Sequence, residues 1–182
     1  MLKRIFDFIF SILGLFFLGL IILLFICIAA FDTNSNGFFL QQRVGQYGKL
    51  FTIYKIKSIH EINKSSSNFG LFLRKYKIDE LPQLINILKG EMSFVGPRPD
   101  IEGYYDKLQG ENEKILELKP GLTSEASIKY VNEEEILRLH SDFLQYNDEI
   151  IFPDKVKMNL QYYYNKSILL DIKIILKTIF RK

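Results

Sequence analysis

An uncharged, strongly apolar run over residues 8–31 constrains this chain more than any other feature. It contains no proline, and Ser11 is its only hydroxyl-bearing residue. As a straight helix the run would measure roughly 36 Å, which is enough to cross a bilayer or to enter it deeply. Lys3 and Arg4 precede it, and Asp32 follows it.

Cleavage of this run as a signal peptide is disfavoured by its length and by its flanks. No small-residue cleavage site follows it, and Ile26 before Cys27 fits a lipoprotein-type site poorly. We therefore predict a membrane-embedded helix over residues 1–31. Residues 32–182 are then long enough for one globular domain.

Composition excludes several classes of protein. The single cysteine rules out an internal disulfide framework and a cysteine-rich zinc site. The formal net charge of +3 is modest, and no nucleic-acid-binding motif is present, so no nucleic-acid partner is expected. Lysines near both ends suit an anionic membrane surface instead.

The pattern of the remaining chain predicts an α+β fold, mostly helical, with one small β-hairpin. The hairpin is expected over residues 38–59, with its turn at residues 45–48 and with Lys55 and Lys57 on one face. A helix is expected to begin near Asp79 and to end at Gly90. Further helices are predicted over residues 111–118, 133–146, 153–164 and 167–180, with a strand within residues 123–131.

Two short motifs suggest phosphoryl transfer. Asp79 and Glu80 lie together at the predicted helix N-terminus, where unsatisfied N–H groups favour an anion. Arg98 lies between Pro97 and Pro99, which restrict the backbone and would hold a planar guanidinium ready for phosphate. Gly96 would let the backbone approach a ligand closely. The alternatives are a helix N-cap with a first-turn acid for Asp79-Glu80, and a rigid surface turn for Arg98.

A longer set of motifs resembles one known family. These are Lys3-Arg4-x-x-Asp7, the block over residues 79–99 that contains both motifs above, Lys119-Pro120-Gly121-Leu122-Thr123, and the segment over residues 167–173. Together with residues 42–58 they make nearly the whole chain similar to the small bacterial sugar transferases, also called monotopic phosphoglycosyl transferases.

The resemblance implies a function. Members of this family move a sugar 1-phosphate from a UDP-sugar to a polyprenyl phosphate, usually undecaprenyl phosphate, and release UMP. The step starts a cell-surface glycan on the cytoplasmic face of the bacterial inner membrane and passes through a covalent aspartyl-phosphosugar intermediate, so ping-pong kinetics are expected.

The resemblance also implies roles for particular residues. Asp79 would be the nucleophile and Glu80 a ligand of Mg²⁺, which is the expected cofactor. The supporting residues would be Arg98 at a phosphate, Lys55, Lys57 and Asp171 beside the substrates, and Asp7 at the membrane boundary. The expected partners are the UDP-sugar, the polyprenyl phosphate and the lipid bilayer, and a homodimer stays open.

The chain departs from the family pattern at two places. Family members commonly carry a proline midway along the membrane helix, which makes the segment re-enter the same leaflet, and this chain has none there. A straight crossing with Lys3 and Arg4 inside would leave Asp79 outside, away from UDP-sugars, so re-entry is the favoured topology. The second departure is Thr123-Ser124-Glu125, where the family usually has Thr-Gly.

Two rival functions remain open. A catalytically inactive membrane scaffold of a glycan assembly complex would release no UMP, and a hydrolase would release UMP without a lipid acceptor.

The C-terminal helix has an apolar side and a basic row at Lys173, Lys177 and Arg181. This pattern suits either a membrane interface or packing on the domain core.

Overall fold

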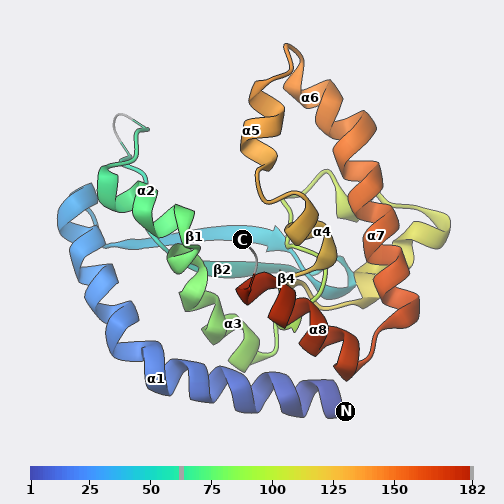
Figure 1. Cartoon of the computed structure of the whole chain (residues 1–182), viewed down its shortest axis with the longest axis horizontal. Helices are drawn as coiled ribbons and strands as arrows, with labels where there is room; N and C mark the ends of the chain where they lie inside the picture. Colours follow the sequence, from blue (N-terminus) through green and yellow to red (C-terminus); the bar gives the residue numbers. More distant parts are fainter. Residues whose placement is uncertain (62–63, 181–182) are drawn as a thin grey trace. The chain divides into compact units, whose positions relative to one another are not determined.

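The computed structural model describes residues 1–61 and 64–180, and Arg181 of the predicted basic row lies outside them. The chain divides into two compact units, Met1–Arg43 with Leu50–Met92, and Val44–Lys49 with Ser93–Lys182. Its elements confirm the predicted α+β class: helices dominate, one β-hairpin is present, and one long apolar helix stands at the N-terminus (Figure 1).

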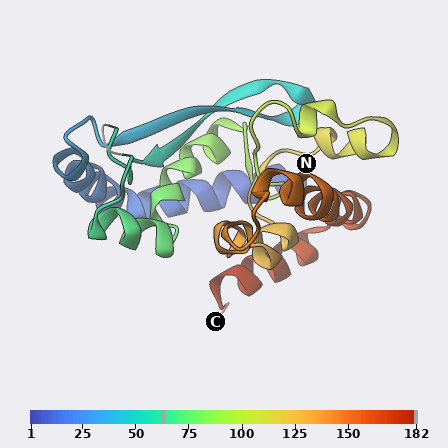
Figure 2. The ribbon, with the colours of Figure 1, turned by 90° about the horizontal axis from the view of Figure 1, so that it is seen from above.

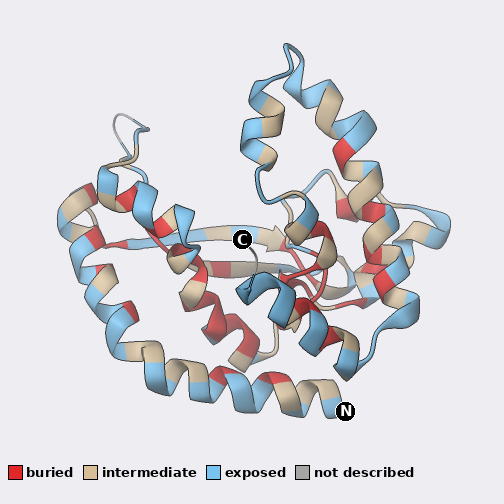
Figure 3. Cartoon of the chain, viewed as in Figure 1, coloured by how far each residue is buried: buried red, intermediate tan, exposed pale blue. Residues whose placement is uncertain are grey.

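Helix α1 (Leu2–Thr33) is one continuous helix, and it changes direction part-way along its length (Figure 1). It is long and apolar enough to cross a membrane, by length and composition. Residues on one face are buried near both ends of the helix, and much of its remaining surface is exposed and apolar (Figure 3). The buried residues follow the helical repeat: Asp7, Ser11, Ile22, Ile26, Ala29 and Thr33.

The buried face of α1 packs on the rest of the first unit. Ile22, Ile26 and Ala29 form one apolar cluster with Ile56 and Leu73. No proline interrupts the helix, so its change of direction is not a proline kink; Gly14 and Gly19 lie in its middle part.

The hairpin is confirmed: β1 (Phe38–Val44) and β2 (Leu50–Ile56) form a two-stranded sheet. Within the first unit, α1, α2 (Asn68–Lys75) and α3 (Leu84–Lys89) lie on one side of this ribbon (Figure 2). Helix α2 was not predicted. Its N-cap is Ser67, whose hydroxyl accepts a hydrogen bond from Gly70 N–H at 3.0 Å.

The second unit contains a sheet that the sequence did not predict. β3 (Ser93–Val95) pairs in parallel with β4 (Gly121–Thr123), with Ser93 opposite Gly121 and Val95 opposite Thr123. The predicted strand within residues 123–131 was therefore largely wrong, since β4 ends at Thr123 and α4 (Glu125–Lys129) follows. Ser124, at the departure from the family pattern, is the N-cap of α4 and accepts a hydrogen bond from Ser127 N–H at 3.0 Å.

The other helices of the second unit largely match the prediction. Residues 133–146 were predicted as one helix, and the structure has two, α5 (Glu133–Arg138) and α6 (Phe143–Tyr146), followed by a π-helical turn, η5 (Asn147–Ile151). The predicted helices over residues 153–164 and 167–180 are confirmed as α7 (Phe152–Asn165) and α8 (Ile168–Ile179). The segment predicted over residues 111–118 is a 3₁₀ helix, η4 (Gly110–Glu117), and short 3₁₀ turns occur at η1 (Gln46–Gly48) and η3 (Tyr105–Lys107).

Candidate active site

Asp79 and Glu80 lie in the first turn of a 3₁₀ helix, η2 (Ile78–Gln83), which leads directly into α3. The residue before this turn, Lys77, has a left-handed backbone with φ of 56°. The helix expected to begin near Asp79 and to end at Gly90 is confirmed, as η2 followed directly by α3 with Gly90 as its C-cap. Its first turn is 3₁₀ rather than α-helical, and the N-cap is Lys77, so the alternative of Asp79 as an N-cap was wrong.

The acidic turn packs on an apolar cluster of the first unit. Ile78 and Leu81, which flank the two acids, pack on the cluster that Ile22, Ile26 and Ala29 of α1 help to form. Both acidic residues are nevertheless buried, at 8% and 6% exposure. The apolar neighbours fix the turn, and the carboxylates are left in a site with little access to water.

The electrostatics of Asp79 are unusual for an aspartate. Among the described residues, its buried Oδ1 atom has no hydrogen-bond partner. Burial, followed by the neighbouring charge of Glu80, raises the pKa of the Asp79 carboxyl, and Lys55, Lys77 and Arg74 oppose that rise. The sequence argument that a helix end keeps this carboxylate ionised therefore meets a larger opposing effect from desolvation.

The two predicted lysines have different partners. Lys55 Nζ lies 2.9 Å from Glu80 Oε1, and its side chain is 16% exposed. Lys57 is also largely buried, but its ammonium pairs with the exposed carboxylate of Glu61, four residues along the chain. Lys55 of β2 thus contacts the acidic turn directly, whereas Lys57 pairs with Glu61 in the segment after β2.

Asp7 is buried at 2% exposure on the face of α1 that packs on the first unit. Arg4, one helical turn earlier, donates hydrogen bonds to the carbonyl oxygens of Ile87 and Leu88 at 2.6 and 2.7 Å. These carbonyls belong to the last turn of α3, where a cation offsets the negative end of the helix dipole. The start of α1 is therefore tied to the helix that follows the acidic turn.

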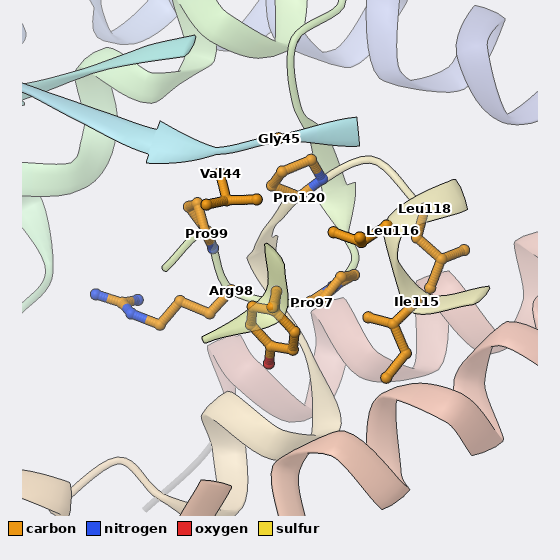
Figure 4. A pocket seen from close by; sticks show the side chains of 10 residues that line it. Val44, Gly45, Pro97, Arg98, Pro99, Ile115, Leu116, Leu118 and Pro120 are labelled. Atoms are coloured by element: carbon orange, nitrogen blue, oxygen red, sulfur yellow. The ribbon is translucent and has the colours of Figure 1, made fainter. Parts of the chain in front are cut away.

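Arg98 lies in the second unit, in the loop after β3. Its backbone borders a small apolar cavity of about 10 Å³, no larger than one water molecule, and the side chain points away from it (Figure 4). Gly96 does make a close approach, but to backbone: a Cβ there would lie 2.2 Å from Lys119 O. Gly96 therefore has a packing role beside Lys119, and its close approach to a ligand stays a prediction.

Asp171, in the first turn of α8, is also in the second unit and is 2% exposed. It accepts a hydrogen bond from the Tyr162 hydroxyl at 2.5 Å, and this hydroxyl is 3.4 Å from the carbonyl oxygen of Val95 at the end of β3. These contacts link the start of α8 to the end of β3 through Tyr162, and the role of Asp171 beside the substrates stays a prediction.

The acidic turn suits a magnesium ion. Mg²⁺ commonly takes one or two carboxylates and completes its shell with water and substrate phosphates. Asp79 and Glu80 supply two carboxylates, and one buried oxygen of Asp79 lacks a partner. Within the described ranges no three His, Cys, Asp or Glu side chains group into a metal cage, so water or substrate oxygens would complete the shell of an ion held here.

Sequence comparison decides the family. The profile described as "Bacterial sugar transferase" matches residues 1–182. The chain belongs to the bacterial sugar transferase family. The protein named "Uncharacterized sugar transferase EpsL" from Bacillus subtilis (strain 168) is 34% identical over 98% of this chain and 85% of its own length.

Longer relatives share the family region. The UDP-glucose:undecaprenyl-phosphate glucose-1-phosphate transferase of Xanthomonas campestris pv. campestris is 34% identical, over 79% of this chain but only 31% of its own length. The galactosyl transferase CpsE of Streptococcus agalactiae serotype III (strain NEM316) is 34% identical over 97% of this chain and 41% of its own length. The chain thus matches less than half of these longer transferases.

The sequence reasoning missed Asn86, which is fully buried in α3 and makes hydrogen bonds to Thr52, Tyr54 and Glu91. The signal was present, because Asn86 is a polar residue inside a short helix otherwise rich in apolar side chains. It also missed the contact of Arg4 with α3, since nothing in a sequence pairs residues more than 80 positions apart.

The burial of Asp79 leads to a prediction about stability. Because the folded state raises the pKa of this carboxyl, it binds the proton more tightly than the unfolded chain does. Stability contributed by protonated Asp79 is present below the unfolded pKa of about 3.9 and is lost as pH rises through the folded value. We expect Asp79→Asn to melt at a higher temperature than the wild type at pH 8, and the difference to disappear at about pH 4.

The measurement is thermal unfolding followed by circular dichroism across this pH range, in chelator and without divalent cations. An exposed-site control, Asp148→Asn, should show no such pH-dependent gain. Equal melting temperatures of Asp79→Asn and wild type at pH 8 would contradict the prediction that burial of the Asp79 carboxylate lowers stability.

Proposed function

We propose that this chain transfers a sugar 1-phosphate from a UDP-sugar to undecaprenyl phosphate and releases UMP, and thereby starts a membrane-bound glycan. The observation that carries the proposal is the buried carboxylate of Asp79, with an unpartnered oxygen, beside the Glu80–Lys55 ion pair. Family membership and the substrates in the names of the Xanthomonas enzyme and similar relatives support it.

The chemistry follows from the nucleophile. An oxygen of Asp79 attacks the phosphorus that carries the sugar, a P–O bond forms, and the bond between the two phosphoryl groups breaks, so that the bridging oxygen leaves with UMP. A phosphate oxygen of undecaprenyl phosphate then attacks the same phosphorus and displaces the Asp79 carboxylate. Two displacements in turn let one small site serve a soluble donor and a lipid acceptor.

The other residues in and around the acidic turn have different proposed roles. Glu80, with Asp79 beside it, would hold Mg²⁺, which when bound supplies positive charge for the diphosphate and the leaving UMP. Lys55 orients Glu80 through its 2.9 Å contact and offsets part of the negative charge around Asp79. Arg98 at a phosphate, Lys57 near the donor and Asp171 as a support stay predictions of the family resemblance.

The experiment that tests the proposal is UMP release by the purified protein with Mg²⁺, a panel of UDP-sugars, and undecaprenyl phosphate present or absent. Lipid-dependent UMP release supports the transferase, and the active donor names the sugar. UMP release that is independent of the lipid would favour the hydrolase, and no release from any donor would favour the scaffold.

Both ends of α1 support a re-entrant segment on the cytoplasmic side. Near its start, Arg4 bonds to the end of α3, and near its end, Ala29 and Ile26 pack with Ile56 and Leu73. Contacts of both helix ends with the same unit support placing the two ends on the same side of the bilayer. The exposed apolar surface of α1 is then available to lipid.

The C-terminal helix suits the same membrane surface. The apolar side of α8 is exposed rather than packed on a core, at 81% for Leu169 and 67% for Ile179, whereas Asp171 and Ile174 are buried. Lys173 lies among these apolar residues in an open groove along the helix. An exposed apolar face with basic residues favours the interfacial alternative over core packing.

Topology gives a prediction of its own. In a Cys27→Ser background, single cysteines at Leu2 and at Asn36, both exposed, should react with an impermeant maleimide from the same side of the membrane. Both should be labelled in inverted inner-membrane vesicles and neither in intact spheroplasts. Labelling of only one site in the inverted vesicles would establish a spanning helix and overturn re-entry.

The pH dependence of the reaction should respond to Lys55. The charge of Lys55 lowers the pKa of Asp79, so Lys55→Met should raise that pKa and move the acid limb of kcat/KM to higher pH. The measurement is UMP release across pH 5–9 at saturating Mg²⁺, with Lys107→Met as an exposed lysine control. An acid limb that stays in place in Lys55→Met would contradict this role.

A further inference from the structure

Both polar atoms of the buried Asn86 side chain make hydrogen bonds. The residue has 0% exposure. Its Nδ2 donates to Thr52 O at 2.7 Å and to Glu91 Oε2 at 2.8 Å, and its Oδ1 accepts from Tyr54 N–H at 3.2 Å. One amide therefore joins α3, β2 and Glu91, which follows the Gly90 cap of the helix.

The contacts with β2 imitate a neighbouring strand. β2 has one strand partner, β1, so its other edge has backbone groups to satisfy. Asn86 meets one carbonyl and one N–H of that edge, two residues apart, as a strand backbone would. A single side chain thus fixes the position of β2 along α3.

Two further contacts, both made by Lys89, link residues that surround the amide. Lys89 Nζ lies 2.8 Å from Glu91 Oε1 and 3.2 Å from the Tyr54 hydroxyl, which closes a ring through Asn86, Glu91, Lys89 and Tyr54. A flipped amide would turn its oxygen toward Thr52 O and the Glu91 carboxylate, both of which are acceptors. These two acceptors therefore select one orientation of the amide, and the ring of contacts around it stabilises that orientation.

We propose that Asn86 is a positioning residue that holds β2 in the register that places Lys55 on Glu80. Lys55 follows Tyr54 directly, so the strand segment that Asn86 binds is the one that carries the Lys55 side chain. The catalytic part of this inference rests on the proposed transferase function. The geometric part does not, because it concerns the Lys55–Glu80 pair alone.

The test of the geometry is the reactivity of the Lys55 amine toward an acylating reagent, read by mass spectrometry well below the melting temperature. In the wild type, Lys55 should react slowly, because it is 16% exposed and paired, while Lys107, 75% exposed, reacts quickly. Asn86→Ala should raise the labelling of Lys55 at least severalfold and leave Lys107 unchanged. Asn86→Asp keeps the size and the acceptor for Tyr54 N–H but loses both donated bonds, so it should give the same change without a cavity.

The matched control is Asn159→Ala. Asn159 is also a buried asparagine, at 2% exposure, and its amide donates to the Tyr105 hydroxyl at 2.8 Å in the second unit. This variant should lose stability without any change in Lys55 labelling. Unchanged Lys55 labelling in both Asn86 variants would overturn the inference and leave the transferase proposal intact.

Turnover supplies the second readout, through kcat and KM for the UDP-sugar in Asn86→Asp, Lys55→Met and the double variant. If Asn86 acts through Lys55, the double variant should lose no more than about twofold beyond the worse single variant, since coupled residues are not additive. If the activity losses of the two single variants multiply in the double variant, the inference is overturned. Absence of lipid-dependent UMP release in the wild type would instead refute the transferase, and the labelling would still decide the role of Asn86.

Discussion

Asp79→Asn is expected to lower lipid-dependent UMP release by at least about a thousandfold, because removal of a covalent nucleophile leaves only binding and electrostatic effects to accelerate the reaction. An amide has nearly the shape of the carboxylate but cannot form the acyl phosphate. Asp79 is buried and follows Ile78, which packs on the apolar cluster of the first unit, and the isosteric change should leave that packing intact.

The same buried position makes the variant informative. The loss of activity should accompany a gain in melting temperature at pH 8, since the amide avoids burial of a negative charge beside Glu80. A residue that only supported the fold would lose activity and stability together. Asp148→Asn is the matched substitution at an exposed site, and UMP release by Asp79→Asn at the rate of that control would refute the nucleophile.

Gly121→Ala is expected to destabilise the protein by about 3 kcal/mol, near the upper end for overpacking, because the new methyl group would meet backbone that cannot move aside. A Cβ at Gly121 would lie 2.1 Å from Gly96 N and 2.7 Å from Gly96 Cα. Gly96 precedes Pro97 and Arg98, and Gly121 N–H donates to Pro97 O at 2.8 Å. The clash would separate β3 from β4 and disturb the arginine loop.

The measurement is a urea or thermal unfolding curve, with donor KM as a second readout of the arginine loop. Gly19→Ala is the matched control, because a Cβ at Gly19 would meet nothing within 4 Å and alanine is the better helix former. Gly121→Ala should melt well below the wild type, and Gly19→Ala should melt at or slightly above it. If the two glycine variants melt together, the backbone contact between residues 96 and 121 does not support the second unit.

The sequence predicted those features that depend on local patterns. The apolar run gave α1, alternation and the turn at residues 45–48 gave the hairpin, and helical spacing gave α7 and α8. It failed where backbone partners are distant in the chain. β3 and β4 are three residues each and about 25 residues apart, which is too short for any alternation to be read, and they exist because Gly96 and Gly121 allow their backbones to meet.

The candidate site divides in the same way. The residue types of the Asp79-Glu80 pair and of the proline-flanked Arg98 are visible in the sequence, as is the family to which they point. Their surroundings are not visible: Lys77 in a left-handed conformation, Lys55 rather than Lys57 on Glu80, and Gly96 against the backbone of Lys119.

By itself, the sequence determined which groups are available for chemistry and that one segment belongs in or on a membrane, because side-chain type and hydrophobic length are local properties. Only the tertiary structure decided how the groups behave. Burial raises the pKa of Asp79, Arg4 ties the start of α1 to the end of α3, and Asn86 hydrogen-bonds to the strand that carries Lys55. Desolvation and hydrogen-bond geometry depend on neighbours that are distant in sequence, so they arise only when the chain is folded.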